Sequence, residues 1–219
     1  MKSVKLIRLT TVPLSLQYLL KGQLKYMGRF FEVKAVSSGP KDELEKVAAH
    51  EKVETKEVNI TRQITPIKDL AALIKLIKYF RKEKPSIVHS ITPKAGLLSM
   101  LAAKFTGVPI RIHTFTGLVF PTKTGFFQSL LIQMDRVLCW AATNIYPEGE
   151  GVKNDLINYK ITSKPLMVIA NGNVNGIDTS YFSPNHFSKQ ERQNLQQELG
   201  IQEDEFVYIF VGRLVGDKG

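Results

Sequence analysis

The feature that most constrains this 219-residue chain is a repeated alternation of short apolar segments with segments of helical periodicity. Strands are expected at 4–9, 31–37, 53–60, 87–90, 111–114, 144–146 and 166–169. Helices are expected between them, at 14–27, 41–51, 66–84, 92–105, 123–143 and 149–158. Strands joined through crossover helices run parallel, so the pattern predicts an α/β domain whose parallel sheet carries helices on both faces.

A linker-like stretch at 178–184 separates this domain from the C-terminal residues. A polar helix is expected at 188–199, ended by Gly200, and a strand at 205–211 that leads into a glycine-rich loop. A strand without a crossover helix or a partner strand is an incomplete domain. We therefore expect one whole domain at 1–180 and the linker and opening of a second α/β domain at 181–219.

Charge is distributed unevenly along the chain. The formal net charge is +10, and the excess of Lys and Arg lies in residues 1–110. Such an asymmetry indicates an anionic partner, such as nucleic acid, anionic lipid or a phosphorylated ligand, although a solvated basic face would look the same. No helix-turn-helix, aromatic platform or other nucleic-acid module is recognisable, so nucleic acid is not expected as a partner.

No uncharged apolar run reaches the length of a membrane-spanning helix, and Arg8 interrupts the apolar start before a signal-peptide core could form. The single cysteine, Cys139, lies in the apolar run V-L-C-W-A-A, which favours a buried thiol over a nucleophile. We expect a cytoplasmic protein that is soluble or lies on a surface.

In open parallel sheets, ligands bind beyond the carboxyl ends of the strands. This rule selects the loops at 10–13, 90–94, 114–120, 147–151, 171–178 and 212–219. None of them carries a dinucleotide or P-loop fingerprint, a G-x-S-x-G elbow or a metal-ligand spacing of histidines. No metal or cofactor is therefore expected.

The last loop, F-V-G-R-L-V-G-D-K-G, has a composition suited to phosphate. Glycines directly after a strand allow the backbone to approach closely, and Arg213 and Lys218 bracket the loop. A diphosphate is well bound by backbone N–H groups together with a guanidinium and an ammonium group. A surface turn with two cations is the alternative.

Five stretches in this order resemble the family 4 glycosyltransferases, which are retaining nucleotide-sugar enzymes of the GT-B fold. They are I-T-R-Q-I-T-P-I-K-D-L-A-A-L, I-V-H-S-I-T-P-K-A-G-L-L-S-M-L-A-A, I-H-T-F-T-G-L-V-F, N-G-N-V-N-G-I-D and G-R-L-V-G-D-K-G. The resemblance spans nearly the whole chain and is closest to members that build bacterial surface polysaccharides. It implies a Rossmann-like acceptor domain followed by the start of a domain for the nucleotide-sugar donor.

The resemblance implies roles for the loop at 212–219. Gly212, Arg213 and Lys218 match the residues that bind the donor diphosphate, and Arg213 and Lys218 would stabilise the departing nucleotide. The family needs no divalent metal, and the chain has no D-x-D motif. The family's E-x7-E region comes well after this loop, so we expect the 219 residues alone to bind a nucleotide sugar poorly and to show no turnover.

The acceptor side is implied by three other loops. Pro13 falls in the first acceptor-side loop, which lacks the family's usual glycine pair, and Lys94 opens a helix that could meet an acceptor phosphate. Many relatives have a histidine directly before the glycine of the loop at 113–120, where this chain has Thr116 and Gly117. Thr116 and Gly117 are assigned to sugar or acceptor contact. His113, three residues before Thr116, either shares that contact or is a core histidine.

Relatives often act on lipid-pyrophosphate-linked acceptors at the cytoplasmic face of the membrane. The basic helix at 66–84 could lie on anionic lipid, and the apolar side chains near Phe126 and Phe127 could insert shallowly or simply face the sheet. The expected partners are thus a nucleotide-sugar donor, a glycan or lipid-linked acceptor and an anionic membrane surface. A non-catalytic scaffold that needs a separate donor domain, or a nucleotide-sugar epimerase on the same fold, remains an alternative.

Overall fold

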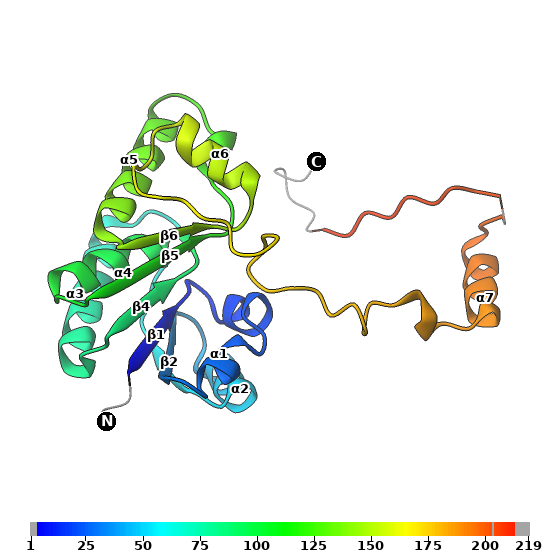
Figure 1. The fold of residues 1–219 in the computed structure, drawn as a ribbon, viewed down its shortest axis with the longest axis horizontal. Coiled ribbons are helices and arrows are strands. Elements are labelled where there is room, and N and C mark those ends of the chain that lie inside the picture. The colour runs from blue at the N-terminus through cyan, green and yellow to red at the C-terminus, as the bar shows by residue number, and fades with distance from the viewer. Residues whose placement is uncertain (1–3, 203, 213–219) are drawn as a thin grey trace. The chain divides into compact units, whose positions relative to one another are not determined.

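The computed structural model describes residues 4–202 and 204–212. Its contacts divide the chain into two compact units, Met1–Asn175 and Gly176–Gly219. The first unit contains a six-stranded sheet with helices on both faces (Figure 1). The predicted Rossmann-like parallel sheet is therefore confirmed.

The strands of this sheet are all parallel and lie in the order β3-β2-β1-β4-β5-β6. The chain starts in the middle of the sheet, extends outward through β2 and β3, and then crosses back to build the other half. The strand order thus reverses between β1 and β4, which is the position where open α/β sheets bind ligands. The strands are β1 Lys5–Leu9, β2 Glu32–Ser37, β3 Glu54–Glu57, β4 Ile87–Ser90, β5 Ile110–Phe115 and β6 Asn144–Pro147.

Two buried clusters fix the helices to the sheet. On one face, Ile7 and Leu9 of β1 pack with α3, α4 and α5; on the other, Leu6 packs with α1, α2 and the short helix η1. Neighbouring residues of one strand therefore supply both cores, as expected for a sheet that is covered on both sides. The helices are η1 Ser15–Leu19, α1 Gln23–Met27, α2 Lys41–Glu51, α3 Pro66–Glu83, α4 Pro93–Phe105, η2 Phe120–Thr122, α5 Gly125–Ala141 and α6 Glu150–Asn158.

Three elements of this unit differ from the prediction. The strand expected at 53–60 is limited to β3, Glu54–Glu57. The helix expected at 14–27 is broken into η1 and α1, because Gly22 adopts a φ of +78°, which lies outside the right-handed helical region. The strand expected at 166–169 is reduced to a single bridge between Ile145 and Leu166. The sheet therefore ends at β6 in the part of the chain that the structure describes.

The second unit contains the short helix η3 Pro184–His186 and the predicted polar helix, α7 Lys189–Leu199. The Ser188 hydroxyl accepts a hydrogen bond from the Glu191 backbone N–H, and the Glu191 carboxylate accepts one from the Ser188 N–H. This reciprocal capping box fixes the start of α7. The strand expected at 205–211 is wrong for this structure: residues 205–212 form no strand, since no described segment pairs with them.

Candidate functional site

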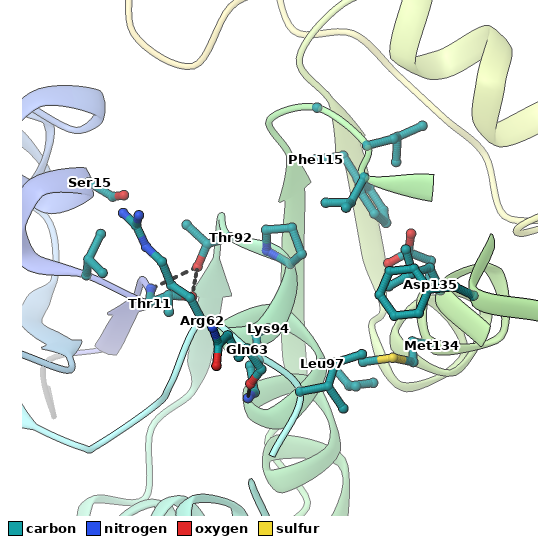
Figure 2. A pocket seen from close by; sticks show the side chains of 18 residues that line it. Thr11, Ser15, Arg62, Gln63, Thr92, Lys94, Leu97, Phe115, Met134 and Asp135 are labelled. Carbon is teal, nitrogen blue, oxygen red and sulfur yellow. Dashed lines mark hydrogen bonds between the residues drawn. The ribbon is translucent and has the colours of Figure 1, made fainter. Parts of the chain in front are cut away.

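A cavity of about 530 Å³ lies at the carboxyl edge of the sheet. The loops that follow β1, β4 and β5 all contribute to it, and the segment 62–64 and helix α5 complete its walls (Figure 2). The loops at 10–13, 90–94 and 114–120, selected from the sequence, thus line one cavity at the switch point. Its lining is mostly hydrocarbon and includes Ile64, Leu97, Leu118, Phe127, Leu131 and Met134.

Threonine side chains tie the three loops together. The Thr92 hydroxyl oxygen accepts a hydrogen bond from the Thr11 backbone N–H at 2.8 Å and lies 2.8 Å from the Thr11 hydroxyl oxygen. The Thr116 hydroxyl donates to the Ile91 carbonyl oxygen at 3.0 Å. These contacts hold the carboxyl ends of β1, β4 and β5 in one arrangement.

Lys94 lines the cavity, but its ammonium group is already paired. Nζ lies 2.6 Å from a carboxylate oxygen of Asp69 in α3 and donates to the Thr61 hydroxyl at 2.8 Å. It also donates to the Gln63 carbonyl oxygen, and the Lys94 side chain is only 9% exposed. Lys94 therefore anchors the segment 61–65 over the start of α4, and a role in direct acceptor contact stays a prediction.

Arg62 belongs to the same segment, but its side chain points away from Lys94. Its exposed side chain extends toward Ser15 along the cavity wall that Thr11 and Thr92 form (Figure 2). The structure shows no acidic group within salt-bridge distance of Arg62 among the described residues. A guanidinium group at this position can bind an anionic ligand. Arg62 was not predicted as a site residue from the sequence, although it lies in one of the stretches that carry the family resemblance.

Asp135 lies on the opposite wall, on α5 (Figure 2). Burial disfavours its ionised form and raises the pKa of the carboxyl group to about 7. Asp135 was not predicted as a site residue from the sequence either. The available signal was its helical spacing from Phe127 and Leu131, at i+8 and i+4, which places an acidic side chain on the apolar face of α5.

His113 does not line the cavity. It is 1% exposed, its Nδ1 lies 2.8 Å from the Ser90 hydroxyl oxygen, and its ring packs edge-on against Phe115 with centroids 4.5 Å apart. Burial lowers the pKa of His113 to about 3, so the imidazole is neutral. This placement fits the core alternative for His113, while a part in sugar or acceptor contact stays a prediction.

The other predicted residues lie in several parts of the chain. Gly117 lines the cavity with a φ of +111°, which is a left-handed conformation that favours glycine. Pro13 is buried against Gly39 and does not line the cavity. Gly212 is exposed in the second unit, whereas Arg213 and Lys218 lie outside the described residues. Their assigned roles all remain predictions.

His89 lies on the opposite face of the sheet from His113. Its Nδ1 meets the guanidinium of the buried Arg8, and its Nε2 lies 2.9 Å from the Thr114 hydroxyl oxygen. Burial and the neighbouring Arg8 lower the pKa of His89 well below its usual range. These contacts describe a structural histidine. Among the described residues, no three His, Cys, Asp or Glu side chains are grouped so that they could hold a metal ion.

Comparisons with known proteins agree with this architecture. A model of Glycosyltransferase Family 4 matches residues 18–180. The capsular polysaccharide biosynthesis glycosyltransferase CapM of Staphylococcus aureus is 34% identical over 223 residues, which cover 100% of this chain and 56% of that protein. The UDP-Gal:alpha-D-GlcNAc-diphosphoundecaprenol alpha-1,3-galactosyltransferase of Escherichia coli is 29% identical over 161 residues, covering 73% of this chain and 40% of that protein.

Among solved structures, a glycosyltransferase from Rickettsia africae superposes with a TM-score of 0.64 at 18% identity. The match covers 93% of this chain and 51% of that one. Because the identity is only 18%, this likeness concerns the fold alone. The chain thus spans about half the length of the relatives and of the solved structure that it matches.

Proposed function

The chain belongs to glycosyltransferase family 4, and from that premise we propose that the protein transfers a sugar from a nucleotide-sugar donor to a glycan or lipid-linked acceptor in surface polysaccharide synthesis. The observation that carries the proposal is the family match over residues 18–180, which includes most of the residues that line the cavity at the switch point. The Staphylococcus aureus relative is named for capsular polysaccharide synthesis, and the Escherichia coli relative for transfer from UDP-Gal to a diphosphoundecaprenol-linked sugar.

The donor side of the proposal rests on the sequence of the second unit. Residues 181–219 would begin the donor domain, in which Gly212, Arg213 and Lys218 bind the diphosphate. Negative charge develops on the diphosphate as its bond to the sugar breaks, and two fixed cations would stabilise that charge. Transfer would proceed with retention of the anomeric configuration, as the resemblance implies.

On the acceptor side, the structure divides the predicted residues into those that could touch an acceptor in the cavity and those that hold the surrounding loops in place. Gly117 lines the cavity and can meet a ligand through its backbone. Thr116 and Lys94 instead fix the loops through their own hydrogen bonds, and His113 supports α4 from within the core. We therefore assign acceptor contact to Gly117 and the apolar part of the cavity lining, and positioning roles to Thr116, Lys94 and His113.

The surface of α3 supports peripheral attachment to the inner face of the membrane. Ile67, Leu70 and Ile74 are exposed along one stripe of the helix, with Ile67 at 86%. Lysine and arginine side chains at positions 68, 75, 78, 81 and 82 are also exposed on α3. A helix that combines exposed apolar and cationic side chains binds anionic lipid surfaces. No helix in the described part of the chain is long and apolar enough to cross a membrane.

The test of the transfer reaction uses the complete protein that contains this chain. Transfer from a panel of UDP-sugars to a sugar-diphosphate lipid is followed by mass spectrometry, and omission of the acceptor reveals any epimerisation of the donor. Arg213→Ala and Lys218→Ala should each lower kcat by about 100-fold. Lys189→Ala, which removes a cation from the exposed helix α7, is the matched control. Unchanged turnover in both loop variants would contradict the assigned donor site.

A further inference from the structure

We propose that the cavity binds the first prenyl units of a lipid-linked diphosphate acceptor, and that Arg62 binds its diphosphate. This inference rests on the proposed function and assigns a ligand class to the acceptor site. It follows from three properties of the described residues: an apolar lining, an unpaired cation on one wall, and a mouth formed by half-exposed apolar side chains.

The lining suits a hydrocarbon chain better than a sugar. Polar side chains such as Thr11, Ser15 and Gln63 also line the cavity, but aliphatic and aromatic groups contribute most of its wall surface. Leu97 contributes from α4 and Leu118 from the loop after β5. Phe127, Leu131 and Met134 form the wall on the side of α5. At about 530 Å³, the cavity is in the size range of sites that bury a small organic ligand.

The charged side chains that line the cavity indicate where the diphosphate and the prenyl chain of the ligand would lie. Two cations line the cavity, but Asp69 neutralises Lys94. Arg62 has no acidic partner among the described residues, and it points toward Ser15 at the edge formed by β1 and β4 (Figure 2). The α5 wall, to which Phe127, Leu131, Met134 and Asp135 contribute, offers a diphosphate no cation. The anionic group therefore belongs beside Arg62 and Ser15, and the hydrocarbon chain beside α5.

The mouth of the cavity provides a route for a lipid. Ile64, Val119 and Phe127 line the cavity and are also 39%, 45% and 44% exposed, so the same side chains face both the ligand and the surface. Phe126, the neighbour of Phe127, is 83% exposed and does not line the cavity. A prenyl chain could thus pass from a membrane into the cavity while it stays in contact with apolar side chains.

Farnesyl diphosphate, a soluble short-chain prenyl diphosphate, tests the inference by titration calorimetry of the 219-residue chain without membranes. Farnesyl diphosphate should bind at least about tenfold more tightly than inorganic diphosphate, because the prenyl chain buries apolar surface. Phe127→Ala should weaken binding about tenfold, because the lost aromatic ring lines the cavity. The matched control Phe126→Ala, one residue away on the same helix, should leave the affinity unchanged.

Arg62→Gln should weaken farnesyl diphosphate about tenfold through loss of a charge-assisted contact, while Arg81→Gln, at the far end of α3, should not. Equal losses in Phe126→Ala and Phe127→Ala, or equally tight binding of inorganic diphosphate, would overturn the inference. Because these measurements need no sugar transfer, their failure is distinct from failure of the proposed function. Transfer by the complete protein with no effect of Phe127→Ala on its KM for the lipid-linked acceptor would also count against the cavity.

Discussion

Gly96 of α4 lies directly against the ring of His113 in β5. A Cβ atom at position 96 would be 2.5 Å from Cε1 and 2.7 Å from Nδ1 of His113, and 2.9 Å from a methyl carbon of Leu138. The absence of a side chain at Gly96 therefore allows α4 to approach the sheet and α5 closely. This approach sets the position of Lys94 and Leu97, which line the cavity from the first turns of α4.

Gly96→Ala should consequently destabilise the protein. The added methyl group would displace the buried His113 or Leu138, at a cost of about 1–3 kcal/mol in the free energy of unfolding. Gly151→Ala is the matched control, because Gly151 lies in helix α6 and has nothing within 4 Å of an added Cβ. It should be neutral or slightly stabilising. Urea unfolding of both variants measures the difference, and equal effects would show that α4 can move away from His113.

Most of the fold could be predicted from the sequence because each element has its own periodicity. The strands at 87–90 and 111–114 and the helix at 66–84 differ from the observed elements by at most a residue or two at each end. The strand order could not be predicted, since it depends on how the crossover helices pack on the two faces. Segment 205–211 reads as a strand locally, but a parallel strand forms only beside a neighbour.

The site could be predicted as a set of loops but not as a set of side chains. The rule that ligands bind at the carboxyl ends of strands selected three of the loops that line the cavity. It could not show that the Lys94 ammonium group is paired with Asp69, because the two residues come from different helices. The selected loops did not include the one after the strand expected at 53–60, where Arg62 lies, and Asp135 lies inside a helix, to which the rule does not apply.

A Lys94→Met substitution should destabilise the segment 61–65. It removes the partner of Asp69 and three hydrogen bonds that Nζ donates to this segment. Breaking one side of a buried pair costs about 3 kcal/mol, which urea unfolding would measure. Hydrogen exchange should rise in residues 61–65, and the double variant Lys94→Met/Asp69→Leu should recover part of the lost stability. If exchange is unchanged while acceptor binding is lost, Lys94 is a contact residue, as the resemblance implies.

His113 should make the protein less stable in acid. Its imidazole stays neutral in the folded state down to about pH 3, whereas in the unfolded chain it takes up a proton below about pH 6.5. The unfolded state therefore binds the extra proton, and stability falls as the pH decreases below 6.5. His113→Asn should reduce the slope of the free energy of unfolding against pH by the contribution of one bound proton. Urea unfolding between pH 7 and pH 5 would measure this slope. Identical slopes for the two proteins would show that folded His113 takes up a proton in this range.

Asp135 should have the opposite pH dependence. Burial raises the pKa of its carboxyl group from 3.8 to about 7, so between these values the folded state keeps a proton that the unfolded chain has lost. The free energy of unfolding therefore decreases as the pH rises through this window, by at most about 1.4 kcal/mol per pH unit. Asp135→Asn, which has nearly the same shape and no charge, should be more stable than the original protein at pH 8.

The gain from Asp135→Asn should shrink toward pH 4, where the original carboxyl group is protonated in the folded state. Urea unfolding at pH 8 and at pH 4.5 measures both ends of the window. A variant that is less stable than the original protein at pH 8 would mean that the ionised carboxylate has a favourable partner. In that case Asp135 would be charged in the cavity at neutral pH, and the wall of α5 would be a polar surface instead of one suited to a hydrocarbon chain.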